Sequence, residues 1–583
     1  MSFFLKVSNQ NNSALKGKYI QIYESYYDNI SKSGKNRCYK SIGYYNDIVS
    51  QGISDPIAYY KDLVISLNTE AKAKKENEKI KKIGDNISKN LGYLIAKNIL
   101  NKLNIKDVFN FIYSSNRYAF DMYSCFESLV YSRLIDSKSK LKTYEDVFPL
   151  LLENSDISLD QIYLCVKNLG MEYQKIVELL NHKFEKAYGK RNTDNVFFDC
   201  TNYYFEIDTP FEDKQFGMSK ENQKAPIIGM GLLLDNDLIP ISFRMYPGNQ
   251  SEKPMIRKMI NEMKEQNSIS GRTIQIADKG LNCAQNIVEA YKNGDGFIYS
   301  QSVNTLPKKI EDIVLDEYGY DITYDKNGEI VFKIKDYIYE KEYEVISEDG
   351  RKSKKTIKQK MVIYYSRDLE RKKRVDITKK VDKAMTKAGG ITKKASLGSG
   401  DKYINLEVIT KAGEESEDVI IKKIDQAQIE HDLSLCGYNI LLTSEIEKDN
   451  KDIYEAYHKL WKIEETFRAL KSNLDARPIY HRNKESIYGH FLICYTAIFI
   501  IRLLELKEFK NELNDQELFG FIKETNCVLL DGVYYNTTRK NNVLEVINER
   551  VNGKYDHLCL KDKDIEKMMS FSFNNTRKWY LTS

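Results

Sequence analysis

The hydrophobic period of the chain changes at residue 195, and this change limits its possible folds more than any other feature. Apolar residues recur every three or four positions through 87–190, which predicts a helical domain. Three strand-like runs then follow one another at 196–205, 226–234 and 238–246. Helical and strand patterns alternate from 252 to 300. Together these patterns predict a mixed α/β sheet next to a helical domain.

Further units are expected on both sides of this sheet. With 583 residues the chain is long enough for several domains at ~100–200 residues each. Strand-like runs joined by Asn327-Gly328 and Asp349-Gly350 predict hairpins, and a lysine-rich segment at 70–82 is expected to be a hinge. The expected domains are a small N-terminal β-type module (1–65), a helical domain (66–190), the first part of an α/β core (191–301), a β-rich basic insertion (302–430), the second part of the core (431–510) and a mixed C-terminal tail (511–583).

Cysteine and histidine patterns exclude several classes of protein. The nine cysteines are odd in number and widely spaced, and none forms a C-x-x-C pair, which argues against a disulfide framework or a zinc knuckle. The six histidines form no H-E-x-x-H motif. The most apolar run, 491–501, is shorter than the ~20 residues of a membrane span. We therefore expect a cytoplasmic protein in which carboxylates hold any metal.

Positive charge is concentrated in one part of the chain. The net charge is only +5, yet residues 351–400 contain 17 Lys and Arg against 4 Asp and Glu. This segment is a candidate phosphate-binding surface, with a solvated helix face as the alternative. Its densest group of candidate DNA contacts is Arg371, Lys372, Lys373 and Arg374.

Two aspartates stand at strand positions where a carboxylate is unusual. Asp199 lies inside the apolar run V-F-F-D-C-T, where an ionised side chain needs a partner, a metal or an exposed sheet edge. Asp278 closes the strand at 273–277 and precedes Lys279-Gly280, a pattern equally typical of an ordinary turn. Sequence spacing alone does not show that the two are close in space.

Glu464 is the third candidate carboxylate. We expect one long helix over 452–474, on which Glu464 lies within about 60° of Leu460 and Phe467 and therefore inside the apolar arc. On the same helix Glu465 is expected to face solvent and Trp461 to lie in the core. A buried Glu464 needs either a salt bridge to Lys471 or a metal shared with other acids. Tyr457, Glu464 and Lys471 follow one another at heptad spacing along one line.

The oxygen donors of Asp199, Asp278 and Glu464 suit hard ions such as Mg²⁺ or Mn²⁺. Two such ions would serve phosphodiester chemistry by activating the attacking oxygen and stabilising the leaving one.

These segments together resemble the DDE transposases of bacterial insertion sequences. The resemblance covers roughly 190–510, and it is carried by the V-F-F-D-C-T strand, Lys220–Pro226 with the G-M-G-L-L-L-D strand, Pro247-Gly248-Asn249 with Ser251-Glu252, Ile276–Gly280, and Tyr457–Lys471. It is closest to the branch with a Y-x2-R-x3-E-x6-K signature, whose RNase H-like core is interrupted by a β-strand insertion. Arg133-Leu134-Ile135 and Ser139-Lys140 in the helical segment also resemble that branch.

The resemblance implies that Asp199, Asp278 and Glu464 are catalytic metal ligands and that Tyr457 and Lys471 contact DNA. Leu460 stands where the signature has arginine, so Lys459 and Lys462 are candidate substitutes as point charges. Arg468 and Arg477 are further candidate DNA contacts.

The implied function is DNA transposition in a bacterial cytoplasm, in association with the nucleoid. The enzyme would bind double-stranded DNA at the element's ends and at the target, act as a homodimer, and use its helical domain and basic insertion to hold end DNA. Two alternatives stay open: an RNase H-like nuclease or resolvase that cuts without joining, and an inactive relative that only binds DNA.

Overall fold

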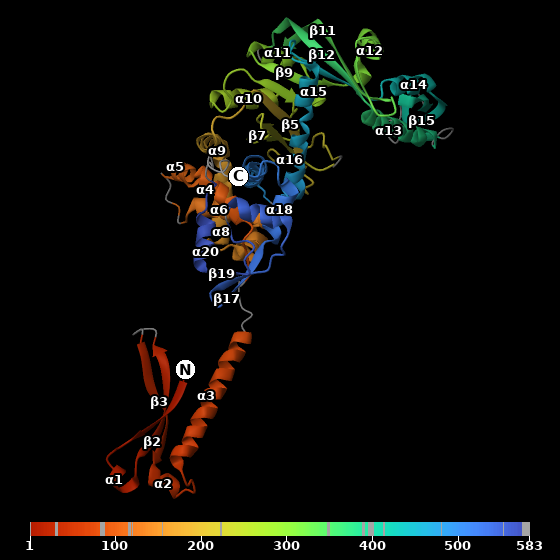
Figure 1. The fold of residues 1–583 in the computed structure, drawn as a ribbon. Helices are drawn as coiled ribbons and strands as arrows, with labels where there is room; N and C mark the ends of the chain where they lie inside the picture. Colours follow the sequence, from red (N-terminus) through yellow and green to blue (C-terminus); the bar gives the residue numbers. More distant parts are fainter. Residues whose placement is uncertain are drawn as a thin grey trace. The chain divides into compact units, whose positions relative to one another are not determined.

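The computed structural model describes residues 2–28, 33–81, 88–114, 118, 120–153, 156–221, 224–346, 350–386, 391–393, 402–411, 414–477, 479, 481–551 and 553–573. The chain forms two compact units, Met1–Ile87 and Ser88–Ser583. Figure 1 colours the chain by sequence.

The first unit is a small antiparallel sheet with a long helix. The sheet has the order β1-β2-β3, and Asn68 of α3 exchanges two hydrogen bonds with the backbone of Phe3 in β1. Helix α3 continues to Lys81, so the predicted hinge is wrong over 70–81, while residue 82 lies outside the described residues. The stretch is rich in Ala, Lys and Glu, which favour helix. The elements are β1 (Ser2–Ser8), α1 (Ser13–Lys16), β2 (Tyr19–Asp28), β3 (Ser33–Tyr44), α2 (Tyr45–Val49) and α3 (Pro56–Lys81).

The second unit is built on a nine-stranded mixed sheet of order β10-β11-β12-β16-β9-β8-β5-β6-β7. β5, β6 and β7 are antiparallel neighbours, whereas β5, β8 and β9 run parallel. The predicted mixed α/β core is therefore confirmed. Its strands are β5 (Asn195–Tyr204), β6 (Ile227–Leu234), β7 (Pro240–Pro247), β8 (Ile274–Ala277), β9 (Gly296–Gln301), β10 (Asp321–Tyr324), β11 (Ile330–Ile346), β12 (Lys352–Ser366) and β16 (Tyr438–Thr443).

Alternating side chains on these strands build two hydrophobic cores. Phe198 and Leu233 pack with the apolar faces of α10 and α11, while Phe197 and Leu232 pack with the helical domain. Figure 1 shows α10 and α11 beside the sheet. The helices next to this sheet are α10 (Met255–Glu265), α11 (Ala284–Lys292), α12 (Lys308–Leu315), α15 (Asn450–His458) and α16 (Trp461–Ser472).

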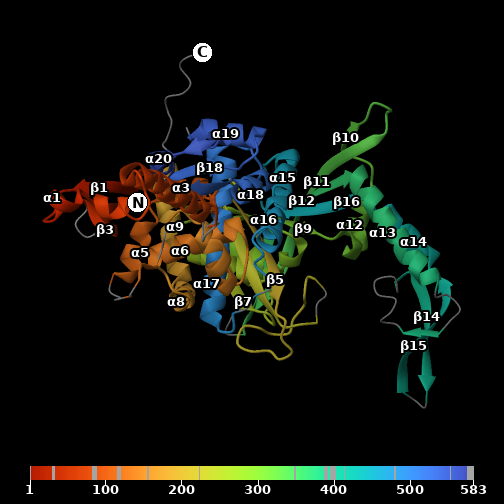
Figure 2. The same cartoon turned by 90° about the horizontal axis from the view of Figure 1, so that it is seen from below.

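The helical domain packs around α17 (Lys484–Leu503). Gly170 in α8 and Gly489 in α17 let the two helices touch, because a Cβ on Gly170 would lie 1.7 Å from the carbonyl oxygen of Glu485. Figure 2 shows α6, α8 and α17 together. The other helices of this domain are α4 (Leu94–Leu103), α5 (Lys106–Tyr113), α6 (Met122–Ile135), α7 (Lys140–Lys142), α8 (Leu159–Met171) and α9 (Tyr173–Tyr188).

Among the described residues, one helical stretch, Lys484–Glu508, is long and apolar enough to cross a membrane, and its most apolar window is entirely buried inside the protein. The stretch extends beyond the predicted run, 491–501, at both ends and includes Arg502. Arg502 is fully buried with acidic partners.

The inserted and C-terminal segments extend this framework. β10, β11 and β12 join the core sheet itself. The basic segment 351–400 begins on β12, and its densest group, Arg371–Arg374, lies on a helix, α13 (Arg367–Met385). The C-terminal segment adds a sheet of order β19-β18-β17-β4. The remaining elements are β13 (Ile391–Lys393), β14 (Ile404–Lys411), β15 (Glu414–Ile424), α14 (Gln426–Ser434), α18 (Asp515–Glu524), β17 (Asn526–Leu530), β18 (Val533–Asn536), α19 (Asn542–Val551), β19 (Cys559–Leu560), α20 (Asp562–Ser570) and β4 (Ser88–Asn90).

Candidate active site

Two of the three predicted carboxylates come from neighbouring parallel strands. Phe198 of β5 is in register with Ala277 of β8. Asp199 and Asp278 each follow these partners by one residue, so they lie side by side although 79 positions separate them in the chain. The sheet therefore brings together the first two predicted site residues.

Asp199 lies in a partly closed, negatively charged environment. Its side chain is 24% exposed, its Oδ1 accepts a hydrogen bond of 2.7 Å from the Cys200 N–H, and the Lys220 Nζ is 3.8 Å away. Burial raises the pKa of Asp199 to about 6. The Lys220 charge opposes this shift, while the nearby carboxylates of Glu252 and Asp278 add to it. A divalent cation would relieve this crowding of acidic groups.

Lys220 and Glu252 complete this environment, although neither was singled out as a site residue from the sequence. The Lys220 Nζ lies 3.1 Å from a Glu252 carboxylate oxygen and also donates to the Cys200 carbonyl. Both residues lie in the sequence motifs that carry the family resemblance, so their positions in those motifs could have identified them. In the structure the Lys220 ammonium group lies near the carboxylates of Asp199 and Glu252, and Asp278 is the third acid nearby.

Asp278 is held by two hydroxyl donors. The Ser300 Oγ donates to its Oδ1 at 2.8 Å, and the Tyr457 Oη donates to the same oxygen at 3.2 Å. Burial raises the pKa of Tyr457, and the Asp278 charge contributes, so the phenol stays protonated as a donor. Tyr457 thus links the end of α15 to the end of β8.

Glu464 and Glu465 occupy faces opposite to those predicted. Glu464 is exposed, whereas the Glu465 side chain is only 15% exposed and bonds Arg502 at 2.9 Å and Lys462 at 2.8 Å. The expectation fails because it counted Trp461 as a core residue on the opposite side of Glu464 from Phe467. Trp461 is exposed, so the buried side of α16, which includes Ile463 and Phe467, ends before it reaches Glu464. α15 ends at His458 and α16 begins at Trp461.

The exposed face of α16 is polar and contains the remaining candidates. Trp461 is 57% exposed, which corrects its predicted core position, and Arg468 is exposed as well. At 100° per residue, Trp461, Arg468 and Lys471 all fall within about 60° of Glu464. Ile463, Thr466, Phe467, Ala469 and Leu470 form the buried face instead.

Within the described part of the chain, no group of three or more His, Cys, Asp or Glu side chains is placed to hold a metal ion. Asp199 and Asp278 alone suit Mg²⁺, which commonly takes one or two carboxylates and fills its other positions with water and phosphate oxygens. The structure thus brings together two of the three predicted ligands, and Glu464 stays a prediction on the helix that packs against β5.

The predicted DNA contacts near α16 fall into two groups. Lys459 and Arg468 are exposed, and Lys471 and Arg477 both pair with Glu221 while remaining partly exposed. Lys462 is 7% exposed and pairs with Glu465 and with a carboxylate oxygen of Glu505 at 2.8 Å. Lys462 therefore cannot replace the missing arginine as a DNA contact, because it is buried in an ion-pair network.

The basic block on α13 is also divided. Arg371 and Lys372 are exposed. The Lys373 Nζ donates to the Tyr438 carbonyl at 3.0 Å, burial lowers its pKa, and Arg374 pairs with Glu370. Among the described residues, Arg371 and Lys372 are thus the exposed members of this group without an ion-pair partner, while Arg374 is half exposed and paired.

A family model described as the transposase DDE domain matches residues 205–500, just over half of the chain. The chain belongs to the DDE transposase family. The match spans Asp278 and Glu464 and begins six residues after Asp199. A search of curated proteins finds no match. A transposase of this family is a DNA-acting enzyme, and DDE transposases generally use divalent metal ions.

Proposed function

We propose that this transposase binds the ends of an insertion sequence, cleaves the DNA strand there, and joins the freed 3′-OH to target DNA. The observation that carries the proposal is the side-by-side placement of Asp199 and Asp278 in a core that matches the transposase DDE domain. Hydrolysis breaks one phosphodiester and leaves a 3′-OH. Attack by that hydroxyl then forms a new phosphodiester and breaks one in the target.

The proposed metal ligands are Asp199, Asp278 and Glu464, holding Mg²⁺ or Mn²⁺, with two ions per site. Bound divalent ions supply charge stabilisation for the reacting oxygens of the phosphodiester. The protein's own contribution is to keep the acids in place. Ser300 and Tyr457 orient Asp278, and Lys220 pairs with both Asp199 and Glu252.

DNA is expected to lie along the exposed face of α16. Lys459, Arg468, Lys471 and Arg477 supply positive charge there, with Arg371 and Lys372 as a second patch on α13. Lys471 and Arg477 share Glu221, which a phosphate of the DNA would replace as their partner. We also propose that the helical domain and the basic insertion hold end DNA, that two copies bring two ends together, and that the enzyme acts in the bacterial cytoplasm on nucleoid DNA.

Cleavage of a duplex that carries the inverted repeat flanking the gene tests the proposal. Wild-type protein should cut it only with Mg²⁺ or Mn²⁺ and should then join the cut end to a target plasmid. Asp278→Asn should lose cutting but keep binding to the duplex, while Asp312→Asn, on an exposed carboxylate of α12, is the matched control. Cutting without joining would favour a nuclease, and binding without cutting by the wild type would contradict the assignment.

A further inference from the structure

A cavity of about 610 Å³, whose lining includes neither of the paired aspartates, is lined mainly by basic residues. It is formed by the turn that contains α7, by the segment that follows α16, and by α17. The Arg, Lys, His and Asp residues in its lining are Arg133, Lys138, Lys140, Lys142, Arg477, His481, His490 and Asp475. Five lysines and arginines thus face a single carboxylate.

The innermost cations have no acidic partner among the described residues. Arg133 is 6% exposed and donates to the carbonyl oxygens of Leu474 at 3.3 Å and Asp475 at 3.5 Å. Lys140 is also 6% exposed, and its Nζ makes no hydrogen bond or ion pair within the described chain. A buried cation without a counter-charge is strongly unfavourable, so this pair is a place where an anion would stabilise the protein.

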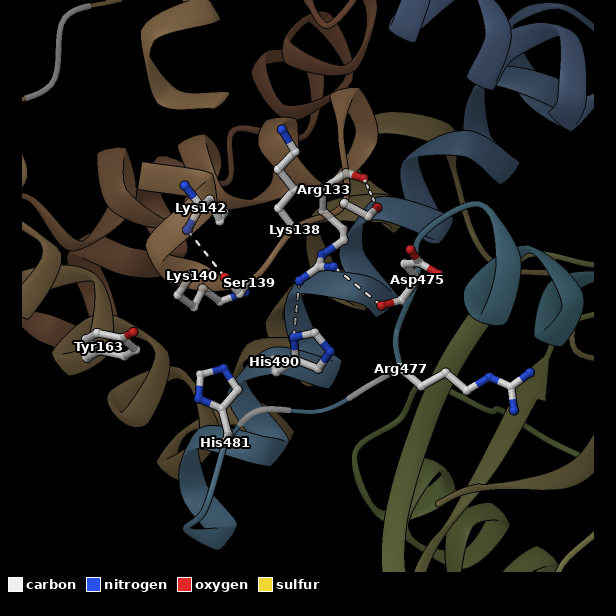
Figure 3. Close-up of a pocket in the computed structure, with 11 residues that line it drawn as sticks. Arg133, Lys138, Ser139, Lys140, Lys142, Tyr163, Asp475, Arg477, His481 and His490 are labelled. Atoms are coloured by element: carbon white, nitrogen blue, oxygen red, sulfur yellow. Dashed lines mark hydrogen bonds between the residues drawn. The ribbon is translucent and has the colours of Figure 1, made fainter. Parts of the chain in front are cut away.

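The outer cations of the cavity differ from the inner ones because acids already neutralise them. Lys142 pairs with Glu145, Lys138 with Asp136 and Asp146, and Arg477 with Glu221. Figure 3 shows Arg133, Lys140, His481 and His490 around a common space, with Arg477 extending away from them. Unbalanced positive charge is therefore confined to the interior of the cavity.

The lining residues also point to the class of anion. Arg and Lys together are the usual protein ligands of phosphate oxygens. Tyr163 at the rim is 43% exposed, so the cavity opens to solvent. At roughly 30 Å³ per water molecule, its volume holds more than a single phosphate and leaves room for the sugars on either side.

We propose that this cavity is a phosphate-binding site, distinct from the active site, in which Arg133 and Lys140 bind a phosphate group of the DNA backbone. The choice of DNA as the source of the phosphate rests on the proposed function, whereas the site itself does not. Because Asp475 and Arg477 follow α16 directly, a strand bound here would be fixed next to the helix that carries Glu464 and Lys471.

The pKa shifts of the residues that line the cavity agree with a phosphate-binding site. Burial lowers the pKa of Lys140 to about 7, and the neighbouring Arg133 charge contributes. Burial likewise lowers the pKa of His481 to about 3 and that of His490 below its usual value. A bound phosphate would favour the charged form of Lys140 and would therefore be accompanied by proton uptake near neutral pH.

The test compares Lys140→Met with Lys142→Met in the full chain. Lys142 lies in the same turn, but its side chain is 58% exposed and paired, so it is the matched control. Inorganic phosphate should raise the thermal midpoint of the wild type and of Lys142→Met, and should leave that of Lys140→Met unchanged. Without phosphate, Lys140→Met should be at least as stable as the wild type, because it removes an unpaired buried cation; this also shows that the variant folds.

A second measurement identifies the source of the phosphate. Binding of a duplex oligonucleotide is measured against salt concentration. Lys140→Met should lower the slope of log K against log salt by about one phosphate contact, near 0.9, and Lys142→Met should not. If inorganic phosphate stabilises the protein but the DNA slope is unchanged, the site binds free phosphate rather than DNA.

The proposal is overturned if inorganic phosphate leaves the wild-type thermal midpoint unchanged and if the midpoints of wild type and Lys140→Met differ by the same amount with and without phosphate. Neither measurement involves cleavage, so failure of the phosphate site and failure of the transposase assignment give different results.

Discussion

Exchanging each member of the Glu464-Glu465 pair for glutamine should separate catalysis from stability. Glu464 is exposed on the face of α16 that also presents Arg468 and Lys471, whereas Glu465 is part of a buried ion-pair network. Glu464→Gln should therefore abolish cleavage and leave the thermal midpoint unchanged. Glu465→Gln should lower the midpoint.

The size of the Glu465 effect follows from the partners of Arg502. Arg502 is fully buried and bonds Glu465 at 2.9 Å, the Thr466 Oγ1 at 3.1 Å, and Glu505. Breaking a buried pair outright costs about 3–5 kcal/mol. Because Glu505 remains and the glutamine still accepts a hydrogen bond, the loss should be about 1–3 kcal/mol. Glu464→Gln should stay within about 0.5 kcal/mol of the wild type, as for other surface substitutions.

Thermal unfolding of the full chain, followed together with Mg²⁺-dependent cleavage, measures both effects. For a unit of this size, the Glu465→Gln loss corresponds to a lowering of the midpoint by roughly 1–3 °C. A Glu464→Gln variant that cuts like the wild type would remove Glu464 from the active site. An unchanged midpoint in Glu465→Gln would show that the charge of Glu465 does not stabilise the protein, because the other partners of Arg502 would then be sufficient.

Three further expectations concern packing, the active site and the basic cavity. Gly170→Ala should abolish folding of the helical domain, because its Cβ would lie 1.7 Å from a backbone oxygen. Gly520→Ala, whose Cβ would have nothing within 4 Å, should instead stabilise the protein by about 0.5–1 kcal/mol. Soluble yield and thermal midpoint distinguish the two variants. Tyr457→Phe removes one of two hydroxyl donors to Asp278 and should slow cleavage about tenfold without changing the midpoint, which single-turnover rates would measure. The pKa of Lys140 is lowered to about 7 in the folded chain, so between about pH 7 and pH 10 the unfolded chain binds more protons than the folded one. The free energy of unfolding of the wild type, relative to that of Lys140→Met, should therefore rise by up to about 1.4 kcal/mol per pH unit over this range. Equal pH profiles of the two proteins would contradict this. The groups facing Lys140 in that comparison are Arg133, Cys125, Cys165, Cys494, His481 and His490.

The sequence predicted the fold well where periodicity decides it. The change of period at 195 correctly located the mixed sheet, and the apolar run around Asp199 correctly indicated a buried strand. Sequence could not predict which strands are neighbours. The pairing of β5 with β8 across 79 residues depends on the whole sheet, because parallel partners carry no local signal.

The prediction for α16 failed for a different reason. Neither proline nor glycine marks the break between His458 and Trp461, so the sequence pattern resembled one continuous helix. Before the break Tyr457 donates to Asp278, and after it Lys462 pairs with Glu505. Because Trp461 is exposed rather than in the core, Glu464 lies on the solvent side of α16 and Glu465 is the acid that faces inward.

Whether each buried charge has a partner distinguishes the structural from the functional ionic groups among the described residues. Around Arg502 and Lys462, two buried cations meet the three acids Glu465, Glu505 and Asp515, and each cation has at least one carboxylate partner. At the end of β5 and β8, Lys220 is the one ion-pair partner of Asp199 and Glu252 within the described chain, and in the cavity beside α7 the buried Arg133 and Lys140 have no acidic partner among those residues. A buried charge without a partner lowers stability unless an outside ion compensates it. A cation would therefore stabilise the site at Asp199 and Asp278, and a phosphate would stabilise the cavity at Arg133 and Lys140. DNA accompanied by divalent ions supplies both.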